Sequence, residues 1–385
     1  MKGLLKERAV FVIGIGMHPY TFPNKNSFVP MGLRAVREAL CDAQIAWEAV
    51  QSAYVGTAAI GMAAGRVMFQ HLGSTGLHVT QVESASASGC SAFRLGCMDV
   101  ASGNNDIVLA MGVDKFGDGK RAANKDGLPR LSPTATIPAV KFALLAREYL
   151  ERHGLPVEAM AKVAVKNHGN AAMNPYAQFR KQRSLEQVLA SPKVAGDFTV
   201  QQCCPRGDGA AAVILASGSA LDRLGYPKQR AVRVLASVAN SERRGTNQEP
   251  SVVEMVRMSS QQAYEEAGIG PKDLDLIELH DAFSIEELLY TEAMGLCKHG
   301  EGAQFLADGA SAINGQCAVN SSGGLLGMGH PLGPTGIGQI AEIVRQIRGE
   351  AQVRQHARSK LGLAHMIGLG SVSFAHVLAS WGETS

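Results

Sequence analysis

The sequence has no apolar run long enough to cross a membrane and no large excess of charge of either sign. A membrane-spanning helix needs about 20 consecutive apolar residues, and no such run occurs. The formal net charge is +3, from 37 basic and 34 acidic residues. Proteins that bind nucleic acid or membrane surfaces usually concentrate positive charge. The composition therefore predicts neither kind of partner.

The chain also lacks the cysteine spacing of a disulfide framework or a zinc site. Its seven cysteines are scattered and odd in number. The first eight residues lead directly into the apolar stretch Ala9–Gly14, which is too short and wrongly flanked for a signal peptide. The last three residues are not a peroxisomal signal. We expect reduced thiols, no metal and a cytoplasmic protein.

With 385 residues and 46% hydrophobic content, the chain is long enough for two halves that each bury a core. Up to Asp114, segments with strand-like and helix-like patterns alternate. The expected strands are Val10–Gly16, Ala53–Thr57, His78–Val82 and Asp106–Asp114, and the expected helices are Met31–Ala43, Gly65–His71 and Ser91–Ala101. This alternation predicts an α/β fold with a mostly parallel sheet covered on both faces.

The alternation stops between residues 116 and 202, a helical and polar region that we expect to cover the mouth of a site. After a strand at Asp208–Leu215, the last part repeats the plan of the first. The repeated segments are a helix at Ser251–Ala267, a strand at Leu274–Leu279, a turn and helix within Asn320–Ile347, and two final strands within Leu363–Ser380. Two related halves predict a site where their glycine-rich turns face each other.

The most informative stretch is Asn320–Gly336, in which glycines surround His330. Glycine allows tight turns and a close approach of the backbone to a ligand. The stretch runs into a helical pattern over Ile337–Ile347, whose first free N–H groups favour developing negative charge. The pattern indicates a histidine held at a helix N-terminus.

Four turns together are similar to those of a known family. The turns are Glu83–Cys90, Glu278–Phe283, Asn320–Gly336 and Ala364–Gly370. The third resembles the GHPxGxTG signature of the thiolase superfamily, and the order and spacing of all four resemble a thiolase over essentially the whole chain. The sequence His-Asp-Ala-Phe in the second turn resembles the sterol-carrier-protein-type branch. The segment 166–179 resembles the cap of that branch and of archaeal thiolases.

The resemblance implies a thiolase fold, in which two duplicated α/β halves form a five-layer αβαβα sandwich with an inserted helical cap. We expect an N-terminal half over residues 1–115 and 203–235, a cap over 116–202, and a C-terminal half over 236–385. The resemblance also implies a homodimer, an acyl-coenzyme A substrate, and coenzyme A as co-substrate without another cofactor. Some relatives of this type work with a small zinc-ribbon/OB-fold protein, so we expect such a partner.

The activity that the resemblance implies is thiolytic cleavage of a 3-ketoacyl thioester or the reverse Claisen condensation. Such a reaction uses a nucleophile at a helix N-terminus, where the dipole and free N–H groups stabilise a tetrahedral oxyanion. By resemblance, His330 is the general base and His280 polarises the thioester oxygen. Backbone N–H groups near Gly368 would form a second oxyanion hole.

The sequence departs from the family at the nucleophile, because Ser86 occupies the position of the usual cysteine. The second family cysteine is missing as well: by resemblance it corresponds to Met366 in the usual C-terminal motif and to Ala282 in the sterol-carrier-protein-type motif. Several explanations stay open: a working serine, a retro-aldol lyase without an acyl-enzyme, a non-catalytic subunit, or a cysteine-to-serine substitution that traps substrate. Cys90 replaces Ser86 as the nucleophile only if the turn is shifted by one helical turn.

Further polar residues are candidates for contacts with the substrate. We expect Gly368, Asn320 and Cys90 to contact the substrate or its oxyanion. In the cap, we expect four residues to contact coenzyme A: His168, Asn174, Arg180 and Lys181. A solvated cap surface is the alternative for these four.

Overall fold

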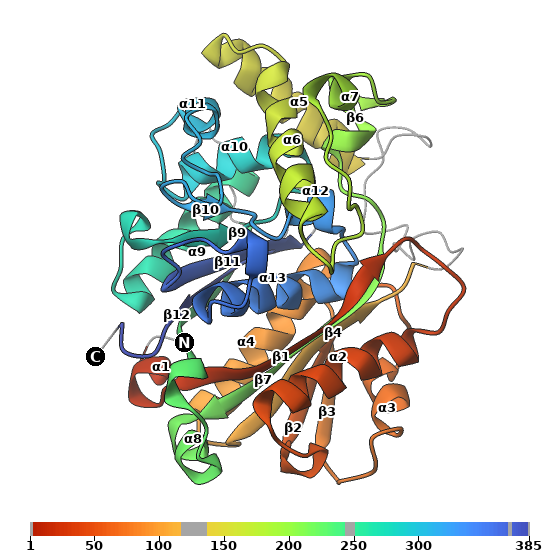
Figure 1. Cartoon of the computed structure of the whole chain (residues 1–385), viewed down its shortest axis with the longest axis vertical. Helices are drawn as coiled ribbons and strands as arrows, with labels where there is room; N and C mark the ends of the chain where they lie inside the picture. The colour runs from red at the N-terminus through yellow and green to blue at the C-terminus, as the bar shows by residue number, and fades with distance from the viewer. Residues whose placement is uncertain (1–2, 117–136, 243–250, 369–371, 384–385) are drawn as a thin grey trace.

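The computed structural model describes residues 3–116, 137–242, 251–368 and 372–383. Two layers of β-strands alternate with three layers of helices (Figure 1). Helices α4 (Ser88–Ala101) and α13 (Leu332–Ile347) lie in the middle layer. Helix α2 (Phe28–Ala43) covers the outer face of the N-terminal half, and α9 (Ser251–Ala267) covers that of the C-terminal half. This is the five-layer sandwich that the sequence predicts.

The two halves repeat one strand order. The N-terminal half contains β1 (Val10–Thr21), β2 (Ser52–Gly56), β3 (His78–Val82), β4 (Ile107–Asp114) and β7 (Asp208–Ser217). The C-terminal half contains β8 (Val232–Ser241), β9 (Leu276–Glu278), β10 (Ala318–Val319), β11 (Leu361–Gly368) and β12 (Val372–Ala379). Numbered within each half, both sets of strands are arranged 3-2-4-5-1. The duplication predicted from the sequence is confirmed.

The sheet is mixed, so the prediction of a mostly parallel sheet is wrong. Strands β2, β3 and β4 are parallel, but β7 lies antiparallel between β4 and β1. In the second half, β12 is antiparallel to both β11 and β8. In each half, the last strand (β7 or β12) lies next to the first strand (β1 or β8) and is antiparallel to it. The halves meet where Val10–Val12 of β1 pair with Val232–Val234 of β8.

The remaining helices complete the outer layer and the region over the site. The α-helices are α1 (Leu4–Glu7), α3 (Ala64–Phe69), α8 (Gly218–Leu224), α10 (Ser284–Ala293), α11 (Gly302–Ala307) and α12 (Gly324–Met328). Between β4 and β7 lie α5 (Ile137–His153), α6 (Glu158–Ala172), α7 (Leu185–Leu189), and the short strands β5 (Lys193–Ala195) and β6 (Phe198–Thr199). Helix α6 packs on α10 and α12, so this excursion rests on the C-terminal half. The domain boundaries stay a prediction, and part of the expected cap falls outside the described residues.

Two histidines are buried in the core of the C-terminal half. His365 on β11 and His376 on β12 have no exposed surface. Burial lowers the pKa of each from the usual 6.5 to about 3. Both side chains are therefore neutral in the folded protein at neutral pH. His376 Nδ1 lies 2.9 Å from Ser237 Oγ, which satisfies one of its ring nitrogens.

These histidines predict a loss of stability in acid. Below pH 6.5 the unfolded chain binds protons that the folded protein binds only near pH 3, so stability falls as pH falls through this window. For His376 the loss between pH 8 and pH 5 is about 2 kcal/mol. We expect His376→Gln to reduce the pH dependence by about that amount in urea unfolding at both pH values. The matched control is His71→Gln at an exposed position, where an equal reduction would contradict the assignment.

Candidate active site

The first turn presents Ser86 at the start of the middle-layer helix α4. Ser86 belongs to a single 3-10 turn, Ala85–Ala87, and retains 7% of its surface. Ser88 holds the turn, because its hydroxyl accepts from Ser84 N at 2.9 Å and donates to Ala85 O at 2.7 Å. Ala85 has a positive φ of 50°, a strained backbone conformation for a residue with a side chain. The turn thus directs Ser86 toward the beginning of the other middle-layer helix.

His330 lies in the glycine-rich stretch immediately before α13 and is 4% exposed. Its Nδ1 is 3.0 Å from Thr335 Oγ1, and that hydroxyl donates its hydrogen to Pro331 O at 2.5 Å. Since the hydroxyl has one hydrogen, it accepts from Nδ1–H of the histidine. The other ring nitrogen, Nε2, therefore carries a lone pair in the neutral ring.

Ser86 and His330 form a hydroxyl–imidazole pair. Ser86 Oγ lies 3.1 Å from His330 Nε2, although 244 positions separate the two residues. This distance allows the hydroxyl to donate to the imidazole lone pair. The structure thus brings together two of the residues that the sequence singles out. The arrangement can transfer a proton from the serine to the histidine when the oxygen attacks an electrophile.

His280 is the third member of this group. It follows β9 in the second turn and is 6% exposed. Its ring centre lies 5.7 Å from that of His330, with the planes nearly perpendicular. Its Nδ1 lies 2.9 Å from Glu286 Oε1. This bond fixes the ring and orients the opposite nitrogen.

An apolar cluster lies next to these groups. It consists of Ala87, Cys90, Ala282, Leu325, Met366 and Phe374, with Cys204 packed against it. Cys90 is fully buried, and burial raises the pKa of its thiol. A Cβ on Gly336 of α13 would lie 2.4 Å from its sulfur, so the thiol packs into the contact between the two helices. The thiol is thus neither accessible nor easily ionised in this structure, and a contact of Cys90 with the substrate stays a prediction.

Asn320 is hydrogen-bonded to the turn that carries His280. Its side chain is fully buried and accepts from Leu279 N at 2.8 Å, while its amide nitrogen lies 3.4 Å from Glu287 Oε2. Its backbone is left-handed, with φ of 55°. Asn320 thus supports the turn that carries His280, and its contact with a substrate stays a prediction.

The four cap candidates separate into two groups. His168 is fully buried, its Nε2 lies 3.2 Å from Gln201 O, and burial lowers its pKa, so it offers no positive charge to a phosphate. Asn174 is buried and donates to Ser322 O at 2.8 Å. Both have partners within the chain, and their contact with coenzyme A stays a prediction. Arg180 and Lys181 are exposed, and their contact with coenzyme A stays a prediction.

Gly368, at the end of β11, packs against the Ser86 turn. A Cβ there would lie 2.2 Å from Ser84 O, so the approach requires glycine. The following residues, 369–371, lie outside the described residues. The second oxyanion hole expected near Gly368 therefore stays a prediction.

Sequence reasoning missed the residues that hold the two histidines. Thr335 is the threonine of the Gly-His-Pro signature, and its place five residues after His330 is the signal for its role. Glu286 is the third residue of α10 and accepts from Phe283 N at 2.8 Å. A glutamate three residues after a helix cap is a recognisable capping signal. The capping pattern gives no indication that the same carboxylate also reaches His280.

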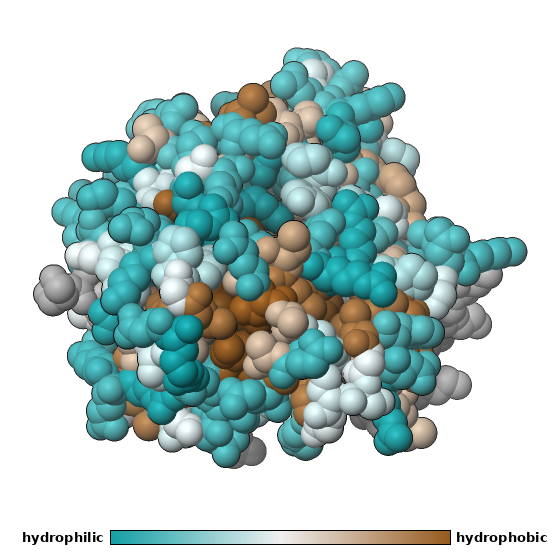
Figure 2. Space-filling view, turned by 60° about the horizontal axis from the view of Figure 1, so that its bottom comes forward, coloured by the Kyte–Doolittle hydropathy of each residue, from teal (hydrophilic) through white to brown (hydrophobic). Residues whose placement is uncertain are grey.

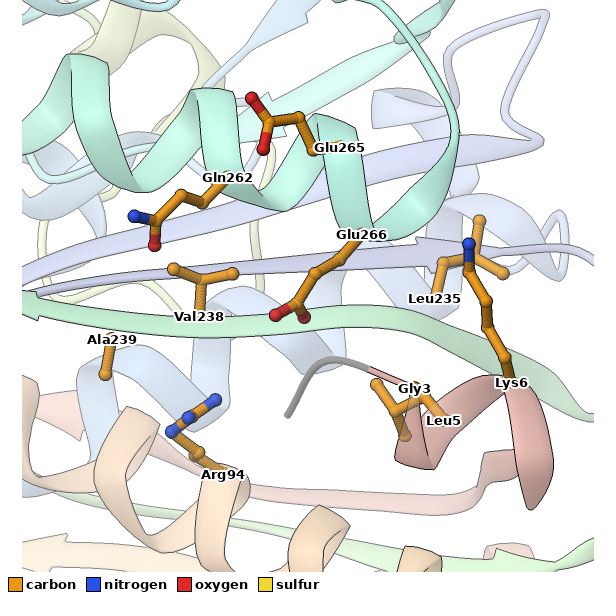
Figure 3. Close-up of a pocket in the computed structure, with 10 residues that line it drawn as sticks. All are labelled: Gly3, Leu5, Lys6, Arg94, Leu235, Val238, Ala239, Gln262, Glu265 and Glu266. Carbon is orange, nitrogen blue, oxygen red and sulfur yellow. The ribbon is translucent and has the colours of Figure 1, made fainter.

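One cavity lies away from these turns. It has a volume of about 700 Å³ and is lined by residues of α1, α4, β8 and α9 (Figure 3). Arg94 and Glu266 extend toward it from opposite walls. None of its lining residues belongs to the four turns. Among the described residues, no helix is long and apolar enough to span a membrane, and no group of three or more His, Cys, Asp or Glu side chains is arranged to hold a metal.

The position of Asn320 predicts a stability defect. Asn320→Ala leaves the buried Leu279 N–H without its acceptor and places alanine at positive φ, so we expect a loss of about 2–4 kcal/mol in unfolding free energy. Urea denaturation measures this loss. The control is Asn26→Ala at an exposed site, which should change stability by less than about 0.5 kcal/mol. Equal stability of the two variants would show that Asn320 does not support the turn.

Residues 15–183 match the model of the thiolase N-terminal domain, and residues 237–380 match the thiolase C-terminal domain-like model. Among solved structures, the "Ltp2-ChsH2(DUF35) aldolase" has a TM-score of 0.85 at 24% identity, covering 97% of this chain and 98% of that one. Human mitochondrial 3-ketoacyl-CoA thiolase in complex with CoA has a TM-score of 0.74 at 20% identity, covering 97% and 98%. These two structures share the fold.

Curated relatives cover nearly the whole chain. Sterol carrier protein 2 of Homo sapiens is 36% identical over 94% of this chain and 70% of its own length. Benzoylsuccinyl-CoA thiolase subunit BbsB of Thauera aromatica is 36% identical over 94% and 96%. Acetyl-CoA acetyltransferase of Methanothermobacter thermautotrophicus is 36% identical over 97% and 100%. Together with the two family models and the duplicated fold, these similarities show that the chain belongs to the thiolase family of acyltransferases.

Proposed function

We propose that this enzyme breaks or forms the bond between C2 and C3 of a 3-ketoacyl-coenzyme A, with Ser86 as the acyl acceptor. The observation that carries the proposal is the 3.1 Å contact between Ser86 Oγ and His330 Nε2. A base held against a hydroxyl at a helix N-terminus is an arrangement for nucleophilic attack on a carbonyl. His280 lies beside this pair, where it can bind the thioester oxygen.

The cleavage can be written with every proton assigned. Ser86 Oγ adds to the C3 carbonyl while its proton passes to His330, and the free N–H groups of α4 stabilise the oxyanion. The C2–C3 bond then breaks, and its electrons form an enolate whose oxygen binds His280. His330 gives the proton that it took from Ser86 to C2 of the enolate, which completes acetyl-coenzyme A. The thiol of coenzyme A next gives its proton to His330 and attacks the serine ester, and His330 returns that proton to Ser86 Oγ as the ester bond breaks.

These reaction steps are harder for a serine hydroxyl than for a cysteine thiol. A cysteine at a helix N-terminus can ionise near neutral pH, whereas an alkoxide cannot. Transfer from an oxyester to a thiol is also uphill compared with exchange between two thioesters. A serine therefore needs the assistance of His330 in both half-reactions.

The hydroxyl in place of a thiol favours a second candidate, a retro-aldol acyl-coenzyme A lyase. In that reaction His330 takes the proton of a 3-hydroxyl group, and the C2–C3 bond breaks to give a carbonyl compound and the same enolate at His280. No acyl-enzyme forms, so Ser86 only hydrogen-bonds. An aldolase with the same fold supports this alternative. A non-catalytic subunit is the remaining possibility from the sequence.

The assembly and location also belong to the proposal. One relative is named as a subunit, and the aldolase structure contains a DUF35 component, which supports a small zinc-ribbon/OB-fold partner for this chain. A homodimer agrees with Figure 2, where apolar side chains line a hollow on one face of the single chain. We propose that the assembly is cytoplasmic and acts in lipid or aromatic acid degradation.

Replacement of Ser86 tests the covalent mechanism. We expect Ser86→Ala to lower single-turnover thiolysis of acetoacetyl-coenzyme A by at least about 10²-fold, because the acyl acceptor is lost. We expect Ser86→Cys to raise it by about 10-fold or more, because a thiolate is accessible there. Intact mass should show an acetyl adduct on the serine and cysteine proteins and none on the alanine variant.

The same variants separate the two candidates. If Ser86→Ala retains cleavage of a 3-hydroxyacyl-coenzyme A and Ser86→Cys is neither acylated nor more active, the lyase replaces the acyltransferase. Cys90→Ala is the internal control. It removes a thiol that packs between the helices, so it should leave the adduct on Ser86 in place.

The exposed cations of the cap provide a test of coenzyme A binding. If Arg180 and Lys181 contact its phosphates, the double alanine variant should raise KM for acyl-coenzyme A by roughly 10-fold. It should leave KM unchanged for the same acyl group on N-acetylcysteamine, which has no phosphate. Equal effects on both substrates would exclude the phosphate contact. Arg147→Ala, an exposed cation on α5 paired with Glu151, is the matched control.

A further inference from the structure

We propose that Gln178 is a positioning residue for His330, because it fixes the backbone at this histidine and so keeps the imidazole within reach of the Ser86 hydroxyl. Gln178 belongs to the segment 166–179, to which the proposed reaction assigns no step. The inference rests on the proposed function for the proton transfer that His330 performs. The contacts of Gln178 carry it independently of the substrate.

The segment that contains Gln178 lies along the stretch that leads to His330. Four of its N–H donors bind carbonyl oxygens of that stretch. The pairs are Asn170 Nδ2 with Asn320 O at 3.0 Å, Asn174 Nδ2 with Ser322 O at 2.8 Å, Phe179 N with Gly327 O at 3.1 Å, and Gln178 N with Met328 O at 2.8 Å. The last of these bonds is formed two residues before the histidine. Gln178 is thus the point where the cap segment comes nearest to His330 along the chain.

The side chain of Gln178 contacts the two backbone segments that meet at His330. Gln178 is 9% exposed, and its Nε2 donates to Arg206 O at 2.8 Å. Arg206 and His330 pair with each other as an isolated bridge between parallel segments. A Cβ on Gly329 would lie 2.5 Å from Gln178 Oε1, so the carboxamide fills the space beside the residue that precedes the histidine. One buried side chain therefore holds both segments.

Two glycines make this close packing possible. Gly329 has a left-handed φ of 107°, and a Cβ there would collide with Gln178. A Cβ on Gly207 would lie 2.7 Å from the same oxygen and 3.3 Å from Pro331 Cδ. The residues before and after His330 thus both pack at this point. Removing the carboxamide would leave a cavity there, into which the backbone that carries His330 could relax.

The imidazole of His330 is held at two places. Thr335 Oγ1 accepts from its Nδ1 and so fixes the rotation of the ring. Gln178 fixes the backbone from which the ring extends. The 3.1 Å distance from Nε2 to Ser86 Oγ depends on both. A displacement of about 1 Å in such a pair can cost about 10²-fold in rate.

Gln202 provides a matched comparison. It is also a buried glutamine between β4 and β7, with no exposed surface. Its Nε2 donates to Ser284 Oγ at 3.2 Å, and its Oε1 accepts from Thr199 N at 3.2 Å. These partners lie outside the turns that carry Ser86 and His330. Alanine at either position removes the same atoms from a buried site, but only the change at Gln178 frees the backbone at His330.

The experiment measures how fast the thiol introduced by Ser86→Cys reacts with iodoacetamide near neutral pH in the full chain. Peptide mass spectrometry follows the product at position 86. A histidine beside a thiol raises the fraction of thiolate, which is the reacting species. In this background, His330→Ala defines the full loss of rate. We expect Gln178→Ala to lower the rate by at least about fivefold and Gln202→Ala to change it by less than about twofold.

Thiolysis by the serine enzyme provides the second measurement. We expect Gln178→Ala to lower kcat for acetoacetyl-coenzyme A by about 10-fold or more, with KM within about threefold of wild type, because the change affects proton transfer and not substrate binding. Gln178→Met keeps the length of the side chain but has no N–H for Arg206 O. It should lower both kcat and the alkylation rate by at least about threefold.

The outcomes separate this inference from the proposed function. An alkylation rate in Gln178→Ala that stays within about twofold of the Ser86→Cys protein overturns the role of Gln178, and so does an equal loss in Gln202→Ala. No loss in His330→Ala also overturns it, since His330 would then not act on position 86. If the wild-type chain cleaves neither a 3-ketoacyl- nor a 3-hydroxyacyl-coenzyme A but the alkylation rates differ as expected, the proposed function fails and the role of Gln178 stands. If Gln178→Ala does not fold, Gln178→Met supplies both measurements.

Discussion

The close approach of two helix N-termini positions the rest of the site. Helices α4 and α13 meet through backbone, because a Cβ on Gly89 of α4 would lie 2.4 Å from Gly333 O of α13, and Gly112 of β4 approaches the same oxygen as closely. Ser86 precedes α4 and His330 precedes α13, so the separation of the helices sets the distance between hydroxyl and imidazole. A side chain at any of these glycines would force the neighbouring elements apart. That shift would lengthen the 3.1 Å distance between Ser86 Oγ and His330 Nε2. Close packing of α4 against α13 is therefore required to hold the Ser86 hydroxyl beside the His330 imidazole.

A buried carboxylate links this packing to the sheet. Asp114, at the end of β4, accepts from Gly333 N at 2.6 Å, from Thr57 Oγ1 at 2.8 Å and from Ala59 N at 2.8 Å. It thus ties the start of α13 to β4 and to the turn after β2. Burial raises the pKa of this carboxyl, and its hydrogen bonds counteract the effect. The loop that carries His330 is thereby anchored in the opposite half of the molecule.

Local patterns predicted much of the fold and part of the site. The helix at Ser251–Ala267 and the strand at His78–Val82 have the predicted bounds, because their periodicity and flanking residues are local signals. The meeting of Ser86, His280 and His330 followed from the repeated turn-plus-helix plan and the resemblance. The antiparallel insertion of β7 did not follow from local patterns, because strand direction is set by long-range pairing. The hydrogen bonds of Asn320 and the burial of Cys90 did not follow for the same reason, since a polar or reactive side chain does not reveal in sequence whether it faces a substrate or another turn.

The shared strand order of the two halves has a consequence for how such a site can arise. Equivalent segments, the entries to α4 and α13, meet at an approximate twofold axis. In a symmetric pair of identical half-chains, any residue at this point would face a copy of itself. An acyl acceptor needs a base of a different chemical type, so strict symmetry would not provide both. When two copies are joined in one chain, the two turns can differ in sequence. The turn before α4 then carries a serine, and the turn before α13 carries a histidine.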